Sequence, residues 1–269
     1  MDKLPGTLFN SGMNRRTFLL MTALATTVLP VFAADPDARC FEMRTYYAAP
    51  GKLDDLLARF RNHTAKLFEK HGITNIGYWV PAENTENKLV YVIAFPNREA
   101  REGKDGSWKA FAADPDWQTA RKASEENGKL VDKVESVFLT ATNFSPEIKA
   151  SVAEPRVFEL RTYTTTPGNL ERLLARFRNH TLSLFAKHGM TNIAYWTPMA
   201  DQKAADSTLV YLMAHKDADA QKASFDAFRK DPDWVAAKDA SEKEAGGSLT
   251  IPDGVKSVIM KATDFSPIR

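Results

Sequence analysis

The chain has a single cysteine, Cys40, among its 269 residues, so no disulfide can form within it. It also has almost no charge imbalance, because Lys and Arg number 36 against 34 Asp and Glu, and the two counts are equal outside residues 1–33. A chain without a net positive field is a poor candidate for binding nucleic acid. No glycine-rich phosphate loop, nucleophile elbow or metal-spaced Cys and His cluster is present. We therefore expect no nucleic-acid partner, no metal and no cofactor.

Long hydrophobic runs are missing as well. The modestly apolar run at 19–33 is shorter than the roughly 20 residues of a membrane span, and Pro30 interrupts it. The run follows Arg15 and Arg16, a combination that favours a twin-arginine export signal over residues 1–34. An uncleaved membrane anchor is the alternative. We expect a bacterial protein that is periplasmic or secreted, with no stable membrane insertion after the signal is cleaved.

The chain does contain a long internal repeat. Residues 41–79 recur at 158–196, a constant 117 positions later, with 27 of 39 residues identical. A repeat of this length indicates that one folding unit was built twice in one chain. Any functional site is therefore to be sought at paired positions or between the two copies.

Each copy shows the same order of expected elements. In the first copy, residues 40–47 alternate with β-type residues and predict a strand. Apolar residues at three- and four-residue spacing after Pro50-Gly51 predict an amphipathic helix that ends near Gly72. The remaining elements expected are strands at 73–80 and 89–95, a helical region at 98–127 that breaks at Asp114-Pro115, and a strand at 130–141.

This βαββαβ order is that of ferredoxin-like domains. We predict an α+β fold of two tandem ferredoxin-like repeats, at 40–145 and 157–267, with a linker at 146–156 that contains two prolines. Each predicted antiparallel sheet has helices on one face only, and the other face must be covered. We expect the two sheets to face each other as an intramolecular α/β barrel with its helices outside.

The first strand of each copy is the best candidate site. Alternation places a polar set on one face: Glu42, Arg44 and Tyr46 in the first copy, and Glu159, Arg161 and Tyr163 in the second. If the helices cover the apolar face, the polar face looks into the space between the sheets. We predict that these residues line a chamber that binds a small anion or a carboxylate-bearing ligand. The alternative is a buried Glu–Arg pair that closes the interior without any ligand.

Aromatic and histidine residues are also paired between the copies. Tyr78-Trp79 and its equivalent should place one ring under the helices and one between the sheets, where Trp79 and Trp196 would contact the ligand. His63 and His180 lie at the edge of the helical apolar stripe. They could reach the chamber as general bases, with Tyr46 and Tyr163 as further catalytic candidates. The alternative is that these histidines are satisfied on the flank of the helix.

A series of short motifs occurs in both copies: Phe-Glu-x-Arg-Thr-Tyr, Pro-Gly, Arg-Asn-His-Thr, Lys-His-Gly, Tyr-Trp, Asp-Pro-x-Trp and Phe-Ser-Pro. Together they resemble the NIPSNAP family over nearly the whole chain after the predicted signal. The resemblance implies the dimeric α/β-barrel superfamily, with the usual pairing of two chains made here within one. That superfamily includes small monooxygenases, haem-handling enzymes and proteins without established chemistry.

Several functional hypotheses remain open at this point. In the first, the chain is an exported protein that binds a small ligand, anionic or aromatic, or a protein partner, without catalysis. In the second, it is a cofactor-independent monooxygenase or isomerase with a cavity between the sheets. Haem binding is a third possibility, and further assembly into a homo-oligomer is open. An interior filled by side chains would argue against the cavity.

Overall fold

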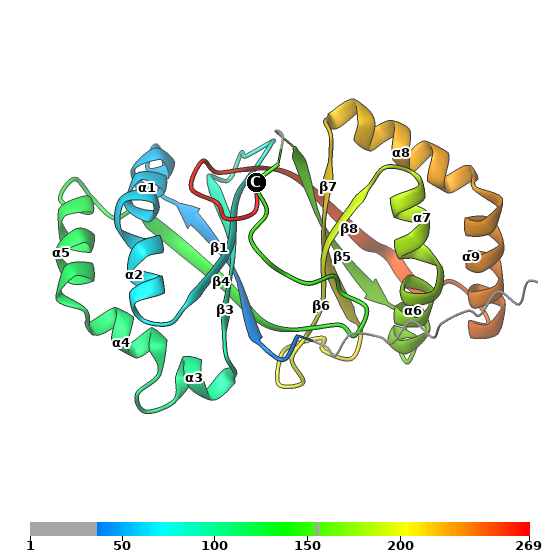
Figure 1. Ribbon diagram of the computed structural model, residues 1–269, viewed down its shortest axis with the longest axis horizontal. Helices are drawn as coiled ribbons and strands as arrows, with labels where there is room; N and C mark the ends of the chain where they lie inside the picture. The colour runs from blue at the N-terminus through cyan, green and yellow to red at the C-terminus, as the bar shows by residue number, and fades with distance from the viewer. Residues whose placement is uncertain (1–36, 154–155) are drawn as a thin grey trace, which may run out of the picture. The chain divides into compact units, whose positions relative to one another are not determined.

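The structure, a computed structural model, describes residues 37–153 and 156–269. In this part of the chain eight strands close into one antiparallel barrel, in the order β1-β3-β2-β8-β5-β7-β6-β4. Helices flank the strands on two sides, as Figure 1 shows. The predicted α+β class and the closed barrel with outer helices are confirmed. The predicted export signal at 1–34 lies outside the described residues.

The order of elements is nearly the same in the two halves of the chain. The first half, residues 40–141, comprises β1 (Cys40–Ala48), α1 (Leu53–Arg59), η1 (Phe60–Thr64), α2 (Ala65–Lys70), β2 (Thr74–Pro81), β3 (Lys88–Phe95), α3 (Arg98–Glu102), α4 (Ser107–Ala113), α5 (Pro115–Ser124) and β4 (Val131–Ala141). The second half, residues 157–262, comprises β5 (Val157–Thr165), α6 (Leu170–Arg176), η2 (Phe177–Thr181), α7 (Leu182–Lys187), β6 (Thr191–Pro198), β7 (Thr208–His215), α8 (Ala218–Lys230), α9 (Pro232–Ala245) and β8 (Thr250–Ala262).

The predicted break in the second helical region occurs in both halves. Asp114 caps α5 by accepting a hydrogen bond from the backbone N–H of Asp116 at 2.8 Å, and Pro115 occupies the first helical position. Asp231 does the same for α9. In the first half the preceding region is divided again, into α3 and α4, whereas α8 is continuous.

The first helix of each half contains a π-helical turn that apolar periodicity did not predict. In η1 the hydroxyl of Thr64 donates a hydrogen bond to the carbonyl of Arg59 at 3.3 Å, and Thr181 repeats this contact with Arg176 at 3.1 Å in η2. A side-chain donor thus satisfies a carbonyl where the turn widens. Short π-helical turns inside α-helices are frequent at functional sites.

Two short strand pairings and two serine side chains join the halves. The paired segments are 79–81 with 260–262, and 139–141 with 196–198. The serines belong to the Phe-Ser-Pro motifs. Ser266 accepts a hydrogen bond from the backbone N–H of Tyr78 at 2.9 Å, and Ser145 accepts one from that of Tyr195 at 3.1 Å. The segment that ends each half is therefore bound to the opposite half.

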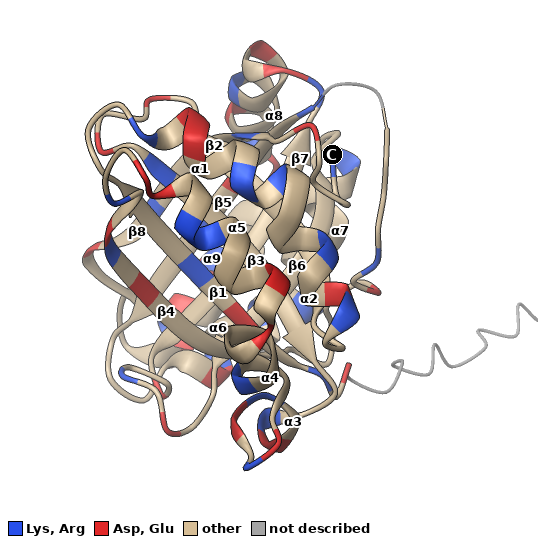
Figure 2. Ribbon diagram, turned by 90° about the vertical axis from the view of Figure 1, so that its left-hand side faces the viewer, with Lys and Arg blue, Asp and Glu red and all other residues tan. Residues whose placement is uncertain are grey.

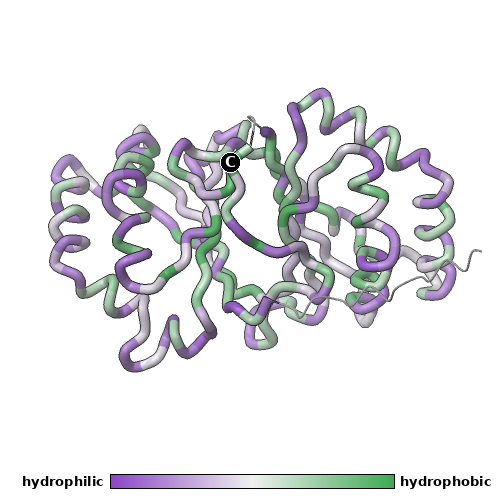
Figure 3. The backbone as a smooth tube through the Cα atoms, viewed as in Figure 1, coloured by the Kyte–Doolittle hydropathy of each residue, from purple (hydrophilic) through white to green (hydrophobic). Residues whose placement is uncertain are grey.

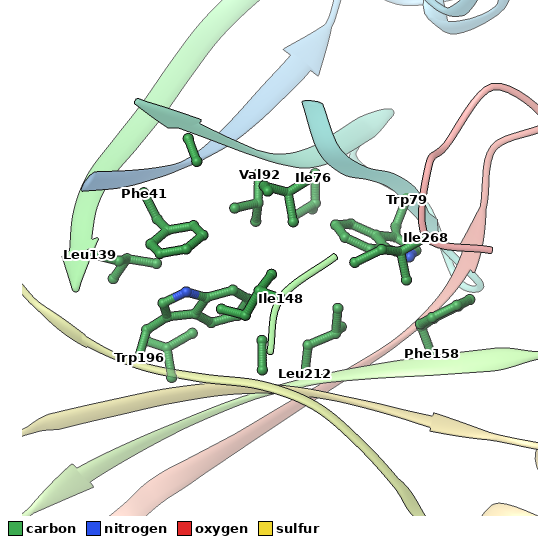
Figure 4. Close-up of a cluster of buried hydrophobic side chains, with 14 of the residues drawn as sticks. Phe41, Ile76, Trp79, Val92, Leu139, Ile148, Phe158, Trp196, Leu212 and Ile268 are labelled. Atoms are coloured by element: carbon green, nitrogen blue, oxygen red, sulfur yellow. The ribbon is translucent and has the colours of Figure 1, made fainter. Parts of the chain in front are cut away.

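The interior of the barrel is filled by apolar side chains from all its strands. Phe41 lies near Trp196, with ring centroids 5.9 Å apart, and Trp79 lies near Phe158 in the same way at 5.8 Å (Figure 4). Side chains from outside the strands complete this core: Ile148 from the connection after β4 and Ile268 from the C-terminal segment. Figure 3 shows hydrophobic segments in the central strands and, alternating with hydrophilic ones, in the helices.

This interior corrects the predicted polar chamber. Phe41 and Met43 belong to the barrel core, whereas Tyr46 packs with the residues under the first-half helices. Glu42 and Glu159 also lie on the helical sides of their own sheets, where Glu42 contacts α3 and Glu159 contacts α8. The prediction failed because both faces of each sheet are buried, so strict alternation did not reveal which face the helices cover.

The outer surface carries charges of both signs. Figure 2 shows Lys and Arg interspersed with Asp and Glu over the helices and strands of one side. Within residues 37–153 and 156–269, no helix combines the length and the hydrophobicity that crossing a membrane requires.

Candidate functional site

The polar side chains of β1 form a buried ion cluster on the helical side of the sheet. Glu42 accepts hydrogen bonds from the guanidinium groups of Arg44 and Arg101, the latter at 3.0 Å, and from the Ser136 hydroxyl at 2.7 Å. Burial acts to raise the pKa of Glu42, but these donors and the two positive charges lower it below its usual value. Two guanidinium groups surround one carboxylate, so the cluster carries an excess positive charge.

The second half has a related cluster with different partners. Glu159 accepts hydrogen bonds from Arg161 at 2.6 Å, Ser257 at 2.6 Å, Gln221 at 3.0 Å and Nε2 of His215 at 3.0 Å. Burial acts to raise the pKa of Glu159, but its hydrogen bonds and the Arg161 charge lower it to about 2. This cluster has one arginine where the first half has two.

A small pocket lies between the sheet and the helices of the first half. Its volume is about 180 Å³, and its lining comprises six aromatic residues, Tyr46, Phe60, Phe68, Trp108, Phe111 and Trp117, together with Arg59, Thr64 and Ala112. The guanidinium carbon of Arg44 lies 4.5 Å from the centre of the Trp108 ring, and that of Arg59 lies 5.2 Å from the centre of the Trp117 ring. These cation–π contacts hold two walls of the pocket in place.

One buried polar atom of the pocket lining lacks a hydrogen-bond partner among the described residues. It is Nε of Arg59. A buried donor without an acceptor costs about 1–3 kcal/mol. A ligand that supplied an acceptor here would recover that free energy.

The structure places His63 and His180 away from the barrel interior and corrects their predicted reach into a chamber. The buried residues of η1 are Phe60 and Thr64, and His63 is exposed beside them. His63 lines a surface groove of about 320 Å³ that also contacts α5, and His180 lines one of about 710 Å³ between α6, α7 and α9. Neither histidine lines the aromatic pocket.

The other paired histidines connect helices. Nε2 of His71 lies 2.6 Å from Oδ2 of Asp114, the residue that caps α5, and His188 makes the same contact with Asp231 at 2.7 Å. Hydrogen bonds from Lys70 and His71 hold the pKa of Asp114 well below its usual value. The described residues contain no group of three or more His, Cys, Asp and Glu placed to hold a metal ion. We therefore assign the His–Asp pairs to packing between helices.

Of the other predicted site residues, Trp79 and Trp196 lie in the barrel core, as expected from the alternation of their strands, while Tyr78 packs under the helices. Their role as ligand contacts stays a prediction. The sequence did not point to the pocket formed by Arg59, Trp108 and Trp117. The Asp-Pro-x-Trp motif, which ends at Trp117 and recurs in the second half, was the signal available for it.

The closed barrel with helices on two sides places the chain among the α/β-barrel proteins, with both sheets supplied by one polypeptide. The NIPSNAP family model matches it twice, over residues 41–146 and 158–267. The chain belongs to the NIPSNAP family, as its motifs predicted.

Curated relatives match nearly the whole chain. Protein NipSnap homolog 3A of Pongo abelii is 26% identical over 97% of this chain and 99% of its own length. Protein NipSnap homolog 3B of Mus musculus is 25% identical over 94% of this chain and 97% of its own. Among solved structures, a provisionally assigned monooxygenase from Fusobacterium nucleatum has a TM-score of 0.54 at 9% identity, covering 84% of this chain and 92% of that chain. This last similarity is one of fold.

These relatives correct the predicted localisation. The curated proteins that match are mammalian NipSnap homologs 3A and 3B, from Pongo abelii, Mus musculus and Homo sapiens, and not bacterial proteins exported by the twin-arginine route. The prediction of a periplasmic or secreted bacterial protein was therefore wrong. It depended on residues 1–34, whose arginine pair and short apolar run were the only features behind it.

Proposed function

We propose that this NIPSNAP-family protein binds a small aromatic or apolar molecule in the pocket of its first half. The observation that carries the proposal is the ring of six aromatic side chains around about 180 Å³. A dry apolar cavity of about 150 Å³ is large enough for one benzene ring. Apolar pockets with a few polar groups are the usual form of a small-molecule site. The volume suits a single ring and is too small for a haem macrocycle.

We also propose that the pocket belongs to one of two tandem ferredoxin-like repeats, at 40–145 and 157–267, with a linker at 146–156. The strand order β4-β1-β3-β2 in one half and β8-β5-β7-β6 in the other supports this division. In such a repeat the sheet and its own helices enclose the ligand. Pairing of the repeats then covers the opposite face of each sheet with the filled barrel core.

A second candidate function is a monooxygenase-type reaction on a ligand bound in the same pocket. It is favoured by the fold shared with the Fusobacterium nucleatum protein and by the phenol of Tyr46 in the lining. The cavity between the sheets plays no part in it, because apolar side chains fill that space. Oxygen uptake by the protein with a bound ring compound would support catalysis. Binding without oxygen uptake would support only the first proposal, ligand binding.

Thermal unfolding with single-ring compounds such as benzyl alcohol tests the binding proposal. A ligand that binds only the folded state raises Tm with its concentration. Ala112→Phe, which adds a ring at the pocket lining, should remove that increase. Ala113→Phe is the matched control, since Ala113 is the next residue of α4 and is exposed outside the lining. No increase with any ring compound, or an equal increase in both variants, would reject the proposal.

A further inference from the structure

We propose, on the basis of the binding function above, that the ligand is a small aromatic carboxylate whose charged group contacts Arg59. We further infer that the second half does not bind it, so that the chain takes one ligand and not two. An unpaired guanidinium N–H and a local excess of positive charge lead to the carboxylate. Three differences between the halves lead to the assignment to the first half.

Arg59 is the one charged residue in the lining of the pocket. Its side chain is 4% exposed, and its Nη1 donates hydrogen bonds to Glu125 at 3.0 Å and to Ser124 at 3.3 Å. Its Nε has no partner among the described residues, and neither has Nε of Arg176, the equivalent residue of the second half. Hydrogen bonds from a guanidinium to a carboxylate are about twice as strong as those between neutral groups. A carboxylate is therefore the acceptor that this N–H favours most.

The charges around the pocket favour an anion over a neutral ligand of the same shape. Glu125 is shared between Arg59 and Arg121, whose Nε lies 3.3 Å from it. Glu42 is shared between Arg44 and Arg101. Both of these last guanidinium groups lie over the Trp108 ring, at 4.5 and 4.7 Å from its centre. Each carboxylate thus faces two cations, and a negative charge placed at the pocket would be attracted.

The second half keeps the fold but changes the pocket. Phe225 stands where the first half has Trp108, and Arg229 where it has Ala112. Gln221 of α8 contacts Glu159 as Arg101 of α3 contacts Glu42. The guanidinium carbon of Arg229 lies 5.5 Å from the centre of the Phe225 ring. Gln221 is neutral, so the Glu159 cluster contains one guanidinium group where the Glu42 cluster contains two. The aromatic wall of the second half is therefore smaller, since Phe replaces Trp, and the Arg229 side chain lies over it.

Titration calorimetry of the full chain with benzoate and benzamide tests this inference, because the two ligands share a ring and differ in charge. We expect one benzoate per chain and binding of benzamide that is about 10- to 100-fold weaker, as the loss of one charge-assisted hydrogen bond implies. Arg59→Gln should weaken benzoate binding by about the same factor and benzamide binding by much less, because the uncharged benzamide loses only a hydrogen bond between neutral and charged groups and no ion pair.

Arg176→Gln is the matched control, because Arg176 makes the equivalent contacts with Ser241 and Trp234 in the second half. It should leave benzoate binding unchanged. If Arg59→Gln does not fold, Arg101→Gln tests the same charge effect by introducing glutamine, the residue type that contacts Glu159 in the second half, and it should also weaken benzoate selectively.

The outcomes separate this inference from the proposed function. Equal affinity for benzoate and benzamide would overturn the carboxylate assignment and leave ring binding in place. Two benzoates per chain, or equal losses with Arg59→Gln and Arg176→Gln, would overturn the assignment to one half. Failure of every ring compound to bind would reject the proposed function itself.

Discussion

Glu42 and Glu159 show how a charge is kept inside this fold. Each carboxylate is fully buried, and each accepts hydrogen bonds from an arginine on its own strand, a serine on the neighbouring strand and a side chain of a covering helix. Replacing these partners by water is impossible within the packed layer. Removing one partner of such a cluster is therefore expected to cost about 3–5 kcal/mol.

Glu159 should make stability depend on pH. Its folded pKa of about 2 is depressed from the ordinary value of 4.5, so its contribution is present above pH 4.5 and is lost as the pH falls towards 2. A shift of this size corresponds to about 3 kcal/mol. Urea unfolding should show Glu159→Gln well below the parent in stability at pH 7, with a much smaller gap near pH 2.5. The exposed change Glu147→Gln is the control, and an unchanged gap at both pH values would contradict this assignment.

At the scale of elements, the Phe-Ser-Pro segments supply hydrogen-bond acceptors where strand pairing ends. β2 pairs with β8 only from Trp79 onward, so the backbone N–H of Tyr78 has no strand partner on that side and uses the Ser266 hydroxyl instead. Phe265 packs on the Tyr78 ring at 5.2 Å. The segment thus satisfies a buried backbone donor where a regular ladder ends.

Ser266→Ala should lower the free energy of unfolding by about 1–3 kcal/mol, because it leaves the buried N–H of Tyr78 without an acceptor. Chemical unfolding would measure this loss. Ser145→Ala should cost a similar amount through Tyr195. Ser248 also accepts a hydrogen bond from a backbone N–H, that of Thr250 at 3.2 Å, but it is exposed. Ser248→Ala should therefore change stability little, because water can replace the hydroxyl. A loss for Ser266→Ala no larger than that for Ser248→Ala would show that the buried contact of the Phe-Ser-Pro segment adds nothing to stability.

At the scale of the whole molecule, the two halves supply each other's core. Phe41 and Leu139 of the first half pack in one cluster with Trp196 and Leu212 of the second. Each sheet alone would expose this apolar face to water, at a cost of about 25 cal/mol per Å². Neither half is therefore expected to be stable as a monomer.

Residues 37–145 expressed alone should self-associate, with two copies rebuilding a barrel through the faces and strand edges that the second half covers. Analytical ultracentrifugation would show a dimer, and dilution should lower its thermal stability because folding and association are coupled. A cooperative, concentration-independent monomer would contradict the dependence of each half on the other.

The sequence by itself determined the elements, the duplication and the family, because periodicity and short motifs are local signals. Only the tertiary structure decided which side of β1 the helices cover. Both sides of the strand are buried, so the alternation of residue types along it does not distinguish them. The tertiary structure also decided which distant residues meet: Arg59 with Trp117, and Glu159 with His215. Such contacts depend on how layers pack and where a π-helical turn widens, and neither leaves a periodic trace in the chain.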